Sequence, residues 1–144
     1  PVFYGDPLRA EVLHAAKVGE AEYFVITTDD PEITTRTAER VKRLYPHLKV
    51  LARARNRQHV HKLTDVGAVP IRETFYSSLE MTRRALVGLG LTEEQAADRI
   101  ERFTEHDEQV LETQGRVRDD RAKVMQNAKE AREELQRLFE SDAD

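Results

Sequence analysis

Residues 23–31 have the sequence YFVITTDDP, an apolar run of four residues followed by a polar loop and a proline. An uninterrupted apolar run of this length is typical of a strand that is buried on both faces of a parallel sheet. Asp30 stands before Pro31, and this pair is suited to cap a helix and to begin it. The stretch therefore predicts a strand, a loop and a helix in that order, as in a βαβ unit.

The same alternation of apolar runs and helical spacing continues on both sides of this stretch. The strands it predicts are residues 2–4, 23–26, 49–55 and 69–71, and the helices are residues 7–19, 31–45, 57–66 and 72–87. Four strands with short connections to the following helices predict an α/β fold. We expect a parallel, doubly wound sheet with flanking helices, whose ligands bind at the carboxyl ends of the strands.

A different pattern begins after the break at Gly88-Leu89-Gly90-Leu91. Two sets of residues recur at intervals of seven, as two positions of a heptad repeat do. The first set is Phe103, Val110, Val117, Val124, Ala131 and Leu138, and the second is Ile100, Asp107, Gln114, Arg121, Ala128 and Leu135. The spacing predicts one long helix, or two stacked end to end, with a seam that is apolar at its ends. The polar middle positions either set the register of a helix pair or are solvated. We therefore expect two domains, residues 1–90 and a helical appendage at 91–144.

The net charge of the chain changes sign at the same boundary, near residue 90, and the composition excludes several classes of protein. The chain has 144 residues and a formal charge of -4, from 27 acidic and 23 basic residues. Residues 91–144 hold 16 acidic and 9 basic residues, a charge of -7, which leaves +3 for residues 1–90. The chain has no cysteine, which excludes disulfides, thiolate metal sites and thiol nucleophiles. Net negative charge argues against a nucleic-acid partner, and we expect a soluble cytosolic protein without a membrane-spanning helix.

Four short motifs occur in one order: residues 2–6 (VFYGD), 28–31 (TDDP), 52–55 (ARAR) and 72–75 (RETF). In that order and spacing they resemble the cytosolic KTN domain, also called RCK, of the Kef potassium-efflux systems. The resemblance implies a partial Rossmann-like fold and a regulatory domain, not an enzyme, that controls a potassium/proton antiporter. It further implies a homodimer at the cytoplasmic face of the inner membrane. The partners implied are the membrane antiporter domain of the same polypeptide and an ancillary cytosolic subunit.

The resemblance also assigns roles to particular residues. It implies an adenine nucleotide, AMP or NAD(H), with Asp6 near the adenosine and with Thr28 and Arg55 at strand ends facing it. It implies glutathione or a glutathione adduct as regulator, with Arg72 binding a glutathione carboxylate. Asp107 stands where Kef sequences place a glutathione-binding Asn, and a carboxylate there would repel a second one.

The family's glycine-rich phosphate loop and the first two strands of its sheet do not occur in these 144 residues. The chain also begins without Met. We therefore expect a piece of a longer protein, in which the glycine-rich half precedes Pro1.

The arginines at the strand ends have two interpretations each. Arg53 and Arg55 are two residues apart, so on a strand they share one face and could flank one anion. Alternatively the strand has ended there, and both are solvated or ion-paired. Arg72 is followed by Glu73, so an internal ion pair competes with ligand binding.

Other polar motifs have structural explanations. Asp6 could be a helix N-cap as well as a ligand residue, and the pair Asp29-Asp30 is better suited to capping than to metal binding. His59 and His61 lie about 200° apart on a helix, so they cannot share one metal ion, and we expect a surface pair and no metal site.

Two rival functions remain open at this stage. One is a fragment of a Rossmann-type NAD-dependent enzyme, although no poised catalytic set stands at a strand end. The other is a structural oligomerisation module that associates through the heptad seam.

Overall fold

The structure, a computed structural model, describes residues 2 and 4–141, and the side chains at 128, 131 and 134–141 lie outside that description. Its residues form two compact units, Pro1–Ala96 and Ala97–Asp144, and each is described here by itself. The domain boundary expected at residue 90 stays a prediction.

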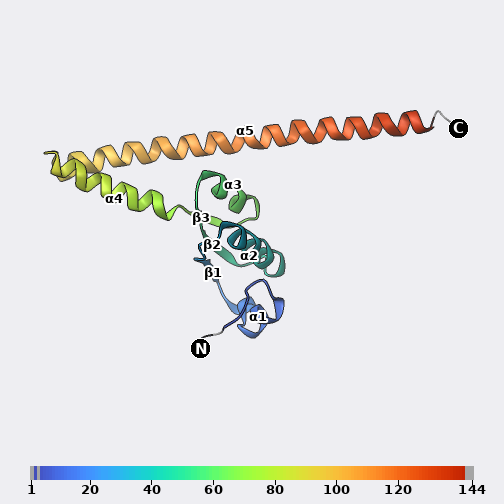
Figure 1. The fold of residues 1–144 in the computed structure, drawn as a ribbon, viewed down its shortest axis with the longest axis horizontal. Helices are drawn as coiled ribbons and strands as arrows, with labels where there is room; N and C mark the ends of the chain where they lie inside the picture. The colour runs from blue at the N-terminus through green and yellow to red at the C-terminus, as the bar shows by residue number, and fades with distance from the viewer. Residues whose placement is uncertain (1, 3, 142–144) are drawn as a thin grey trace. The chain divides into compact units, whose positions relative to one another are not determined.

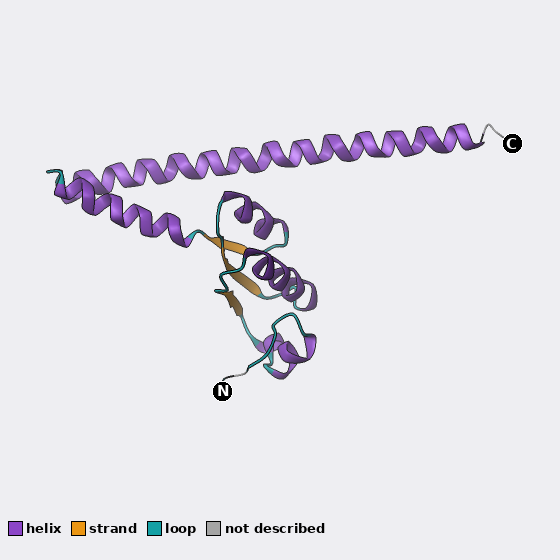
Figure 2. Ribbon diagram, in the orientation of Figure 1, coloured by secondary structure: helices purple, strands orange, loops and turns teal. Residues whose placement is uncertain are grey.

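A parallel three-stranded sheet organises the first unit. The elements follow in the order α1 (Ala10–Ala15), the 3-10 helix η1 (Val18–Glu20), β1 (Tyr23–Ile26), α2 (Pro31–Leu44), β2 (Lys49–Arg53), α3 (Arg57–Asp65), β3 (Val69–Ile71) and α4 (Glu73–Gly88) (Figure 1, Figure 2). The strand order is β1-β2-β3, with Val25 opposite Leu51 and Leu51 opposite Val69. This arrangement confirms the predicted α/β fold, a partial Rossmann-like parallel sheet with flanking helices.

Helices α2 and α3 cover one face of the sheet. Val50 and Ala52 of β2 and Ile26 of β1 point toward them and are buried. The helices supply the rest of this core from one stripe each, because their buried residues recur at helical spacing: Thr34, Thr37, Ala38 and Val41 from α2, and His59, Val60 and Leu63 from α3. The core therefore lies between this single layer of helices and the sheet.

The opposite face of the sheet is apolar and exposed. Val25, Val69 and Ile71 expose 59%, 51% and 43% of their surface. The prediction that residues 23–26 are buried on both faces is therefore wrong, and so is the prediction of a doubly wound sheet. The crossovers between parallel strands all have the same hand, and the strands follow one another in sequence order. Successive helices therefore lie on the same face of the sheet, and neither α2 nor α3 can cover the opposite face.

The N-terminal segment also differs from the prediction. Val2 and Tyr4 are not in a strand, Tyr4 is exposed, and Phe3 lies outside the described residues. A strand needs a neighbour to satisfy its backbone groups, and β1 pairs only with β2 among the described residues. The helix begins later than residue 7, at Ala10, with Arg9 and not Asp6 at the N-cap position. Asp6 instead accepts a hydrogen bond from the Leu8 backbone N–H at 2.8 Å, which closes a turn before the helix.

The start of α2 follows the predicted capping. The Asp30 carboxylate accepts hydrogen bonds from the backbone N–H groups of Glu32 and Ile33, both at 2.9 Å, and Pro31 occupies the first turn. These bonds satisfy two of the amides that a helix leaves without an internal partner. The helix ends at Leu44, two residues before Pro46, which is also as predicted.

A glycine turn and a capping box join α4 to α5 (Glu93–Ser141). Gly90 has a φ of 102°, and the Leu91 N–H donates to the Leu86 carbonyl at 3.1 Å, which is typical of a helix end. Thr92 and Gln95 then exchange side-chain to backbone hydrogen bonds at 3.0 and 3.2 Å. The appendage continues through residue 115 as one helix, which settles the choice between one helix and two. Of its polar middle residues, Gln114 and Arg121 are exposed, whereas Asp107 is 4% exposed, which does not fit a solvated middle.

We predict that Asp30→Ala lowers the free energy of unfolding by about 1 kcal/mol, because two backbone N–H groups of α2 lose their acceptor. Urea denaturation of the chain measures the change. Asp30→Asn is the matched control, since its side-chain oxygen can still accept, and it should keep most of the stability. Equal stability of Asp30→Ala and the unchanged chain would contradict the capping role.

Candidate functional site

The carboxyl ends of the three strands meet at one edge of the sheet. Ile26 of β1 lies opposite Ala52 of β2, and Arg53 lies opposite Ile71 of β3, so each strand ends within a residue or two of its neighbour. The loops that leave this edge carry Thr28 after β1, Arg55 after β2 and Arg72 after β3. Polar side chains from three loops therefore gather at the edge where parallel α/β sheets bind ligands.

The Thr28 loop is tied to the first turn of α2. The Thr28 hydroxyl lies 2.7 Å from the Thr34 hydroxyl, and Thr34 is buried. The Thr34 hydroxyl in turn donates to the Asp30 carbonyl at 2.8 Å. Because the loop is held at both its ends, Thr28 keeps a fixed place beside the end of β1 while remaining exposed.

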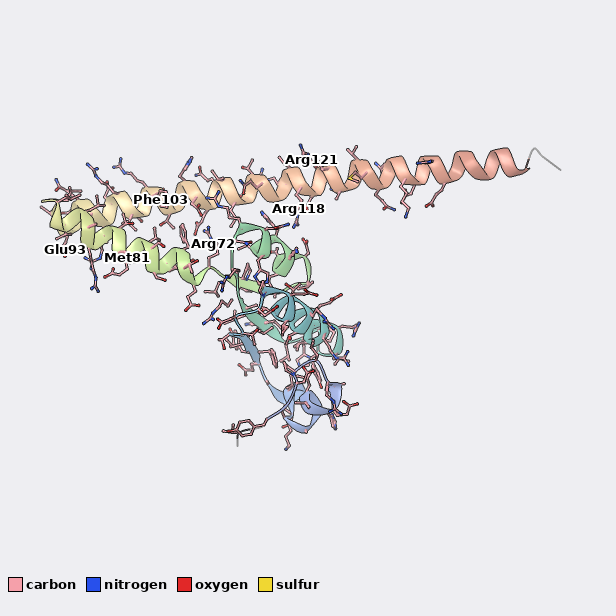
Figure 3. The ribbon with its side chains drawn as sticks, in the orientation of Figure 1. Arg72, Met81, Glu93, Phe103, Arg118 and Arg121 are labelled. Carbon is pink, nitrogen blue, oxygen red and sulfur yellow. The ribbon has the colours of Figure 1, made fainter. Side chains whose placement is uncertain are left out.

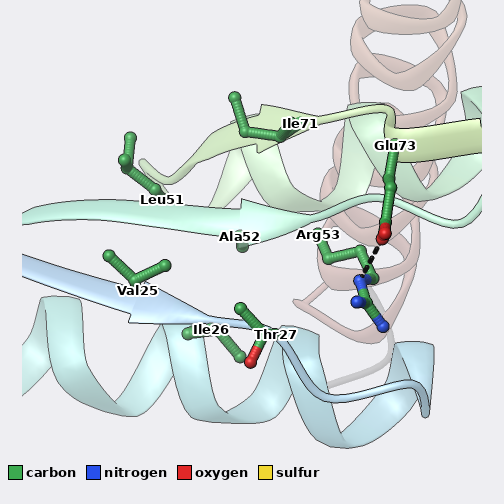
Figure 4. A pocket seen from close by; sticks show the side chains of 8 residues that line it. All are labelled: Val25, Ile26, Thr27, Leu51, Ala52, Arg53, Ile71 and Glu73. Atoms are coloured by element: carbon green, nitrogen blue, oxygen red, sulfur yellow. Dashed lines mark ion pairs between the residues drawn. The ribbon is translucent and has the colours of Figure 1, made fainter. Parts of the chain in front are cut away.

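Arg53 bridges the loops on either side of β2. Its guanidinium forms ion pairs with Asp29, from the loop after β1, and with Glu73, the first residue of α4 (Figure 4). Of the two interpretations of Arg53, the structure supports ion pairing over a vacant anion site. Glu73, which the sequence offered as a partner for Arg72, pairs with Arg53. Sequence reasoning missed this bridge, and the available signal was a carboxylate at the end of each neighbouring strand.

A pocket of about 250 Å³ lies on the exposed face of the sheet beside this bridge. Figure 4 shows Val25, Leu51 and Ile71 along its floor, with Thr27, Arg53 and Glu73 at the carboxyl end. Pockets for whole small-molecule ligands are usually 300–1,000 Å³, as an order of magnitude, so this one would hold part of a ligand, such as a flat ring.

The three remaining predicted ligand residues lie in different segments of the chain. Arg72 precedes α4 (Figure 3). Its guanidinium lies 4.0 Å from the centre of the Phe75 ring, a cation–π contact that orients it. Asp107 belongs to α5, in the second unit. Asp6 closes its own turn in the segment before α1 and is exposed. Their ligand roles stay predictions.

His59 is buried, which corrects the expectation of a surface pair with His61. Its ring contacts α2 through Thr35 and the end of β2 through the Arg55 backbone. Leu63 lies four residues further on the same helix and is fully buried, so the i, i+4 spacing is the signal that places His59 on the buried face. In the part of the chain that the structure describes, no three His, Asp or Glu side chains are arranged to hold a metal ion.

A parallel sheet with helices on one face and polar residues at its carboxyl edge defines a Rossmann-like domain, a class in which ligands bind at that edge. The chain belongs to the family of Kef C-terminal domains, as the following matches show. Residues 1–72 match the TrkA-N domain, and residues 77–144 match the potassium efflux system KefB C-terminal domain.

Two individual relatives support this assignment. The glutathione-regulated potassium-efflux system protein KefC of Salmonella arizonae is 38% identical over 120 residues, which is 83% of this chain. The chain spans 19% of that protein's length. The Kef C-terminal domain of Shewanella denitrificans, solved in an AMP-bound form, is 33% identical with a TM-score of 0.76, and the match covers 81% of this chain and 74% of that one. Within residues 2 and 4–141, no helix has both the length and the apolar composition to span a membrane.

We predict that Arg53→Met costs about 1 kcal/mol of stability or less. The side chains of Asp29 and Glu73 are 86% and 57% exposed, so water and salt screen both ion pairs. Urea denaturation at low and at high salt measures the loss, which should shrink as salt rises. Arg55→Met, which removes the same charge two residues away, is the control. A loss of several kcal/mol that salt does not change would show that the bridge holds the strands together.

Proposed function

We propose that this chain is the ligand-sensing part of a regulatory domain that controls a potassium/proton efflux antiporter through an adenine nucleotide and through glutathione or its adducts. The observation that carries the proposal is the match to a Kef C-terminal domain solved with AMP, over 81% of this chain. We further propose that the domain acts by binding and not by catalysis, at the cytoplasmic face of the inner membrane. Its partners are then the membrane domain of the same polypeptide and an ancillary cytosolic subunit.

The nucleotide is proposed to bind at the carboxyl edge of the sheet. Thr28 and Arg55 leave neighbouring strands at that edge, and both side chains are exposed. A threonine hydroxyl and a guanidinium can hydrogen-bond to the ribose and phosphate of a nucleotide. Asp6 is assigned to the adenosine by resemblance alone, because its side chain is engaged with Leu8 in this chain. The glycine-rich phosphate loop would come from the longer protein.

By resemblance, the regulator is proposed to bind between the strand ends of the sheet and a partner subunit, with Arg72 and Asp107 as the residues assigned to it. The Arg72 guanidinium is planar, and a guanidinium can pair with a carboxylate through two hydrogen bonds. A carboxylate at Asp107 disfavours a second carboxylate beside it. Ligands of different bulk would then favour different arrangements of two domains, and the membrane domain would respond to that change in population.

A homodimer is proposed to use the exposed face of the sheet. Val25, Leu51 and Val69 form one row across the three strands, and Ile71 extends it. Helix α4 likewise buries none of its residues fully, although Phe75, Leu79 and Leu86 make one side of it apolar. Contiguous apolar surface of this kind is typical of an interaction site. A second copy of the chain carries the same two apolar surfaces, the sheet face and one side of α4, so two copies can cover each other's apolar surface.

We predict that AMP and glutathione each raise the melting temperature of the full-length protein's regulatory domain, because a ligand that binds only the folded state stabilises it. Asp107→Asn should tighten glutathione binding roughly two- to fivefold, because it removes the repulsion between two carboxylates. Arg72→Gln should abolish the glutathione effect, while Arg84→Gln, which removes the same charge from α4, should not. The absence of stabilisation by AMP, by glutathione and by a bulky adduct would refute the proposed function.

We predict that Val25→Asp converts the dimer to a monomer, because a charge placed in the middle of the apolar face must be desolvated on association. Light scattering coupled to size-exclusion chromatography measures the mass. Leu44→Asp makes the same kind of change at an exposed position of α2 and should leave the dimer intact. If both variants stay dimeric, the sheet face is not the interface, and deletion of residues 100–144 then tests the helical appendage.

A further inference from the structure

The ring of His59 joins three segments of the first unit. His59 stands in the first turn of α3, where its backbone N–H donates to the Asn56 side chain at 2.9 Å. Its side chain is 4% exposed. One ring nitrogen faces α2, and the other faces the residue that leads β2 into α3. A buried imidazole with two contacts of this kind is a structural joint that protonation can change.

The hydrogen bonds around the ring allow one neutral tautomer. The Arg55 backbone N–H donates to Nδ1 at 3.0 Å, so Nδ1 must be the unprotonated nitrogen. Nε2 lies 3.0 Å from the Thr35 hydroxyl, which itself donates to the Pro31 carbonyl at 2.8 Å. The Thr35 oxygen therefore accepts a hydrogen bond from the Nε2–H group. Each donor in this series of hydrogen bonds around the His59 ring has an acceptor. No acceptor is left for a second ring proton.

Protonation of Nδ1 would place two N–H donors against each other. A backbone amide cannot act as an acceptor, so the Arg55–His59 hydrogen bond cannot survive in the imidazolium form. Either the ring turns away or the Arg55 segment moves. A cavity of about 450 Å³ between α2 and α3 is lined in part by His59, which gives the ring space to turn.

The group that His59 holds is at the proposed nucleotide edge. The sheet ladder ends with Ala54, whose N–H donates to the Ile71 carbonyl at 2.8 Å. Arg55 is the next residue, and its amide is paired with His59 in place of a strand. The direction in which the chain leaves the sheet at Arg55 therefore depends on the neutral imidazole. Arg55 is also the residue assigned to the nucleotide above.

We propose that His59 is a pH-sensitive positioning residue, which in its neutral form holds Arg55 at the carboxyl edge of the sheet and releases it on protonation. Its part in nucleotide binding rests on the proposed function, whereas its hold on the Arg55 backbone does not. Proton concentration on the side of the membrane where the domain lies would thereby change the affinity for an anionic ligand at that edge.

The charges around the ring favour the neutral form. Glu32 and Arg36 of α2 and Lys62 of α3 line the cavity beside the ring, so two cations and one anion face it. Burial, followed by the charge of Lys62, lowers the pKa of His59 below its usual 6.5, while the Pro31 carbonyl acts in the opposite direction. The sign follows from proton binding. Between the lowered pKa and 6.5 the unfolded chain binds more protons than the folded one, so stability falls as pH falls through this window.

The test follows the Arg55 amide and the His59 ring by NMR in the ¹⁵N-labelled full 144-residue chain as pH is lowered. At neutral pH the ring should show its proton on Nε2. On acidification the Arg55 amide shift should follow the same titration as the ring, with a midpoint below 6.5. His61→Asn, which removes a neighbouring imidazole from α3, should leave this titration unchanged. A proton on Nδ1 at neutral pH, or an Arg55 amide that does not follow the ring, would overturn the proposal.

A second variant separates positioning from simple packing. Asn at position 59 can present an oxygen to the Arg55 N–H but cannot become charged, so His59→Asn should abolish the titration of the Arg55 amide. In the full-length protein, AMP affinity should fall between pH 7.5 and 5.5 by roughly fivefold more in the unchanged protein than in His59→Asn, the lower end of usual coupling between sites. Equal pH dependence in both proteins would overturn the coupling. If AMP fails to bind at any pH while the Arg55 amide still titrates, the positioning role is supported and the proposed function fails.

Discussion

Two crossovers in sequence, from β1 through α2 to β2 and from β2 through α3 to β3, decide most of what this chain can do. Crossovers between parallel strands have one hand, and strands laid down in the order 1-2-3 therefore receive both helices on the same face. This one constraint gives the unit a core between the sheet and α2 and α3. It also leaves the other face, with Val25, Val69 and Ile71, without cover from these helices. The strand ends and the loops that follow them are brought to a single edge by the same constraint.

Local signals were sufficient for the elements from residue 23 to residue 88. The apolar run at 23–26, the cap at Asp30 and the glycine turn at Gly90 depend on neighbours within a few residues, so the sequence pattern contains the cause of each. The strand predicted at residues 2–4 does not form, because a strand depends on residues that are distant in the sequence. Its stability depends on hydrogen bonds to another strand, and apolar character at three residues carries no information about whether that strand is present.

The site was less predictable than the fold because its contacts join distant parts of the chain. The Arg53 bridge reaches Asp29 and Glu73, which are 24 and 20 residues away, and no periodic pattern encodes such pairs. His59 had a usable signal in its spacing from Leu63, but its polarity favoured the surface. What makes burial acceptable is a pair of partners, Thr35 and the Arg55 amide, that only the folded arrangement supplies. The resemblance supplied Thr28 and Arg55 as ligand residues without the contacts that hold them.

Arg53, the last residue of β2, and Arg55, two residues beyond it, differ in what holds them at the proposed ligand edge. Arg53 still lies in the ladder, and its charge is matched by two carboxylates from neighbouring loops, so it contributes to the structure of the edge more than to anion binding. Arg55 lies just beyond the ladder, where its side chain is exposed and its backbone is held by one neutral imidazole. A residue that is held by the sheet cannot move without breaking the hydrogen bonds between strands. A residue that is held by a titratable group can move when that group is protonated. The position at which the ladder stops, between Ala54 and Arg55, is therefore what separates a structural cation from one that a proton can release.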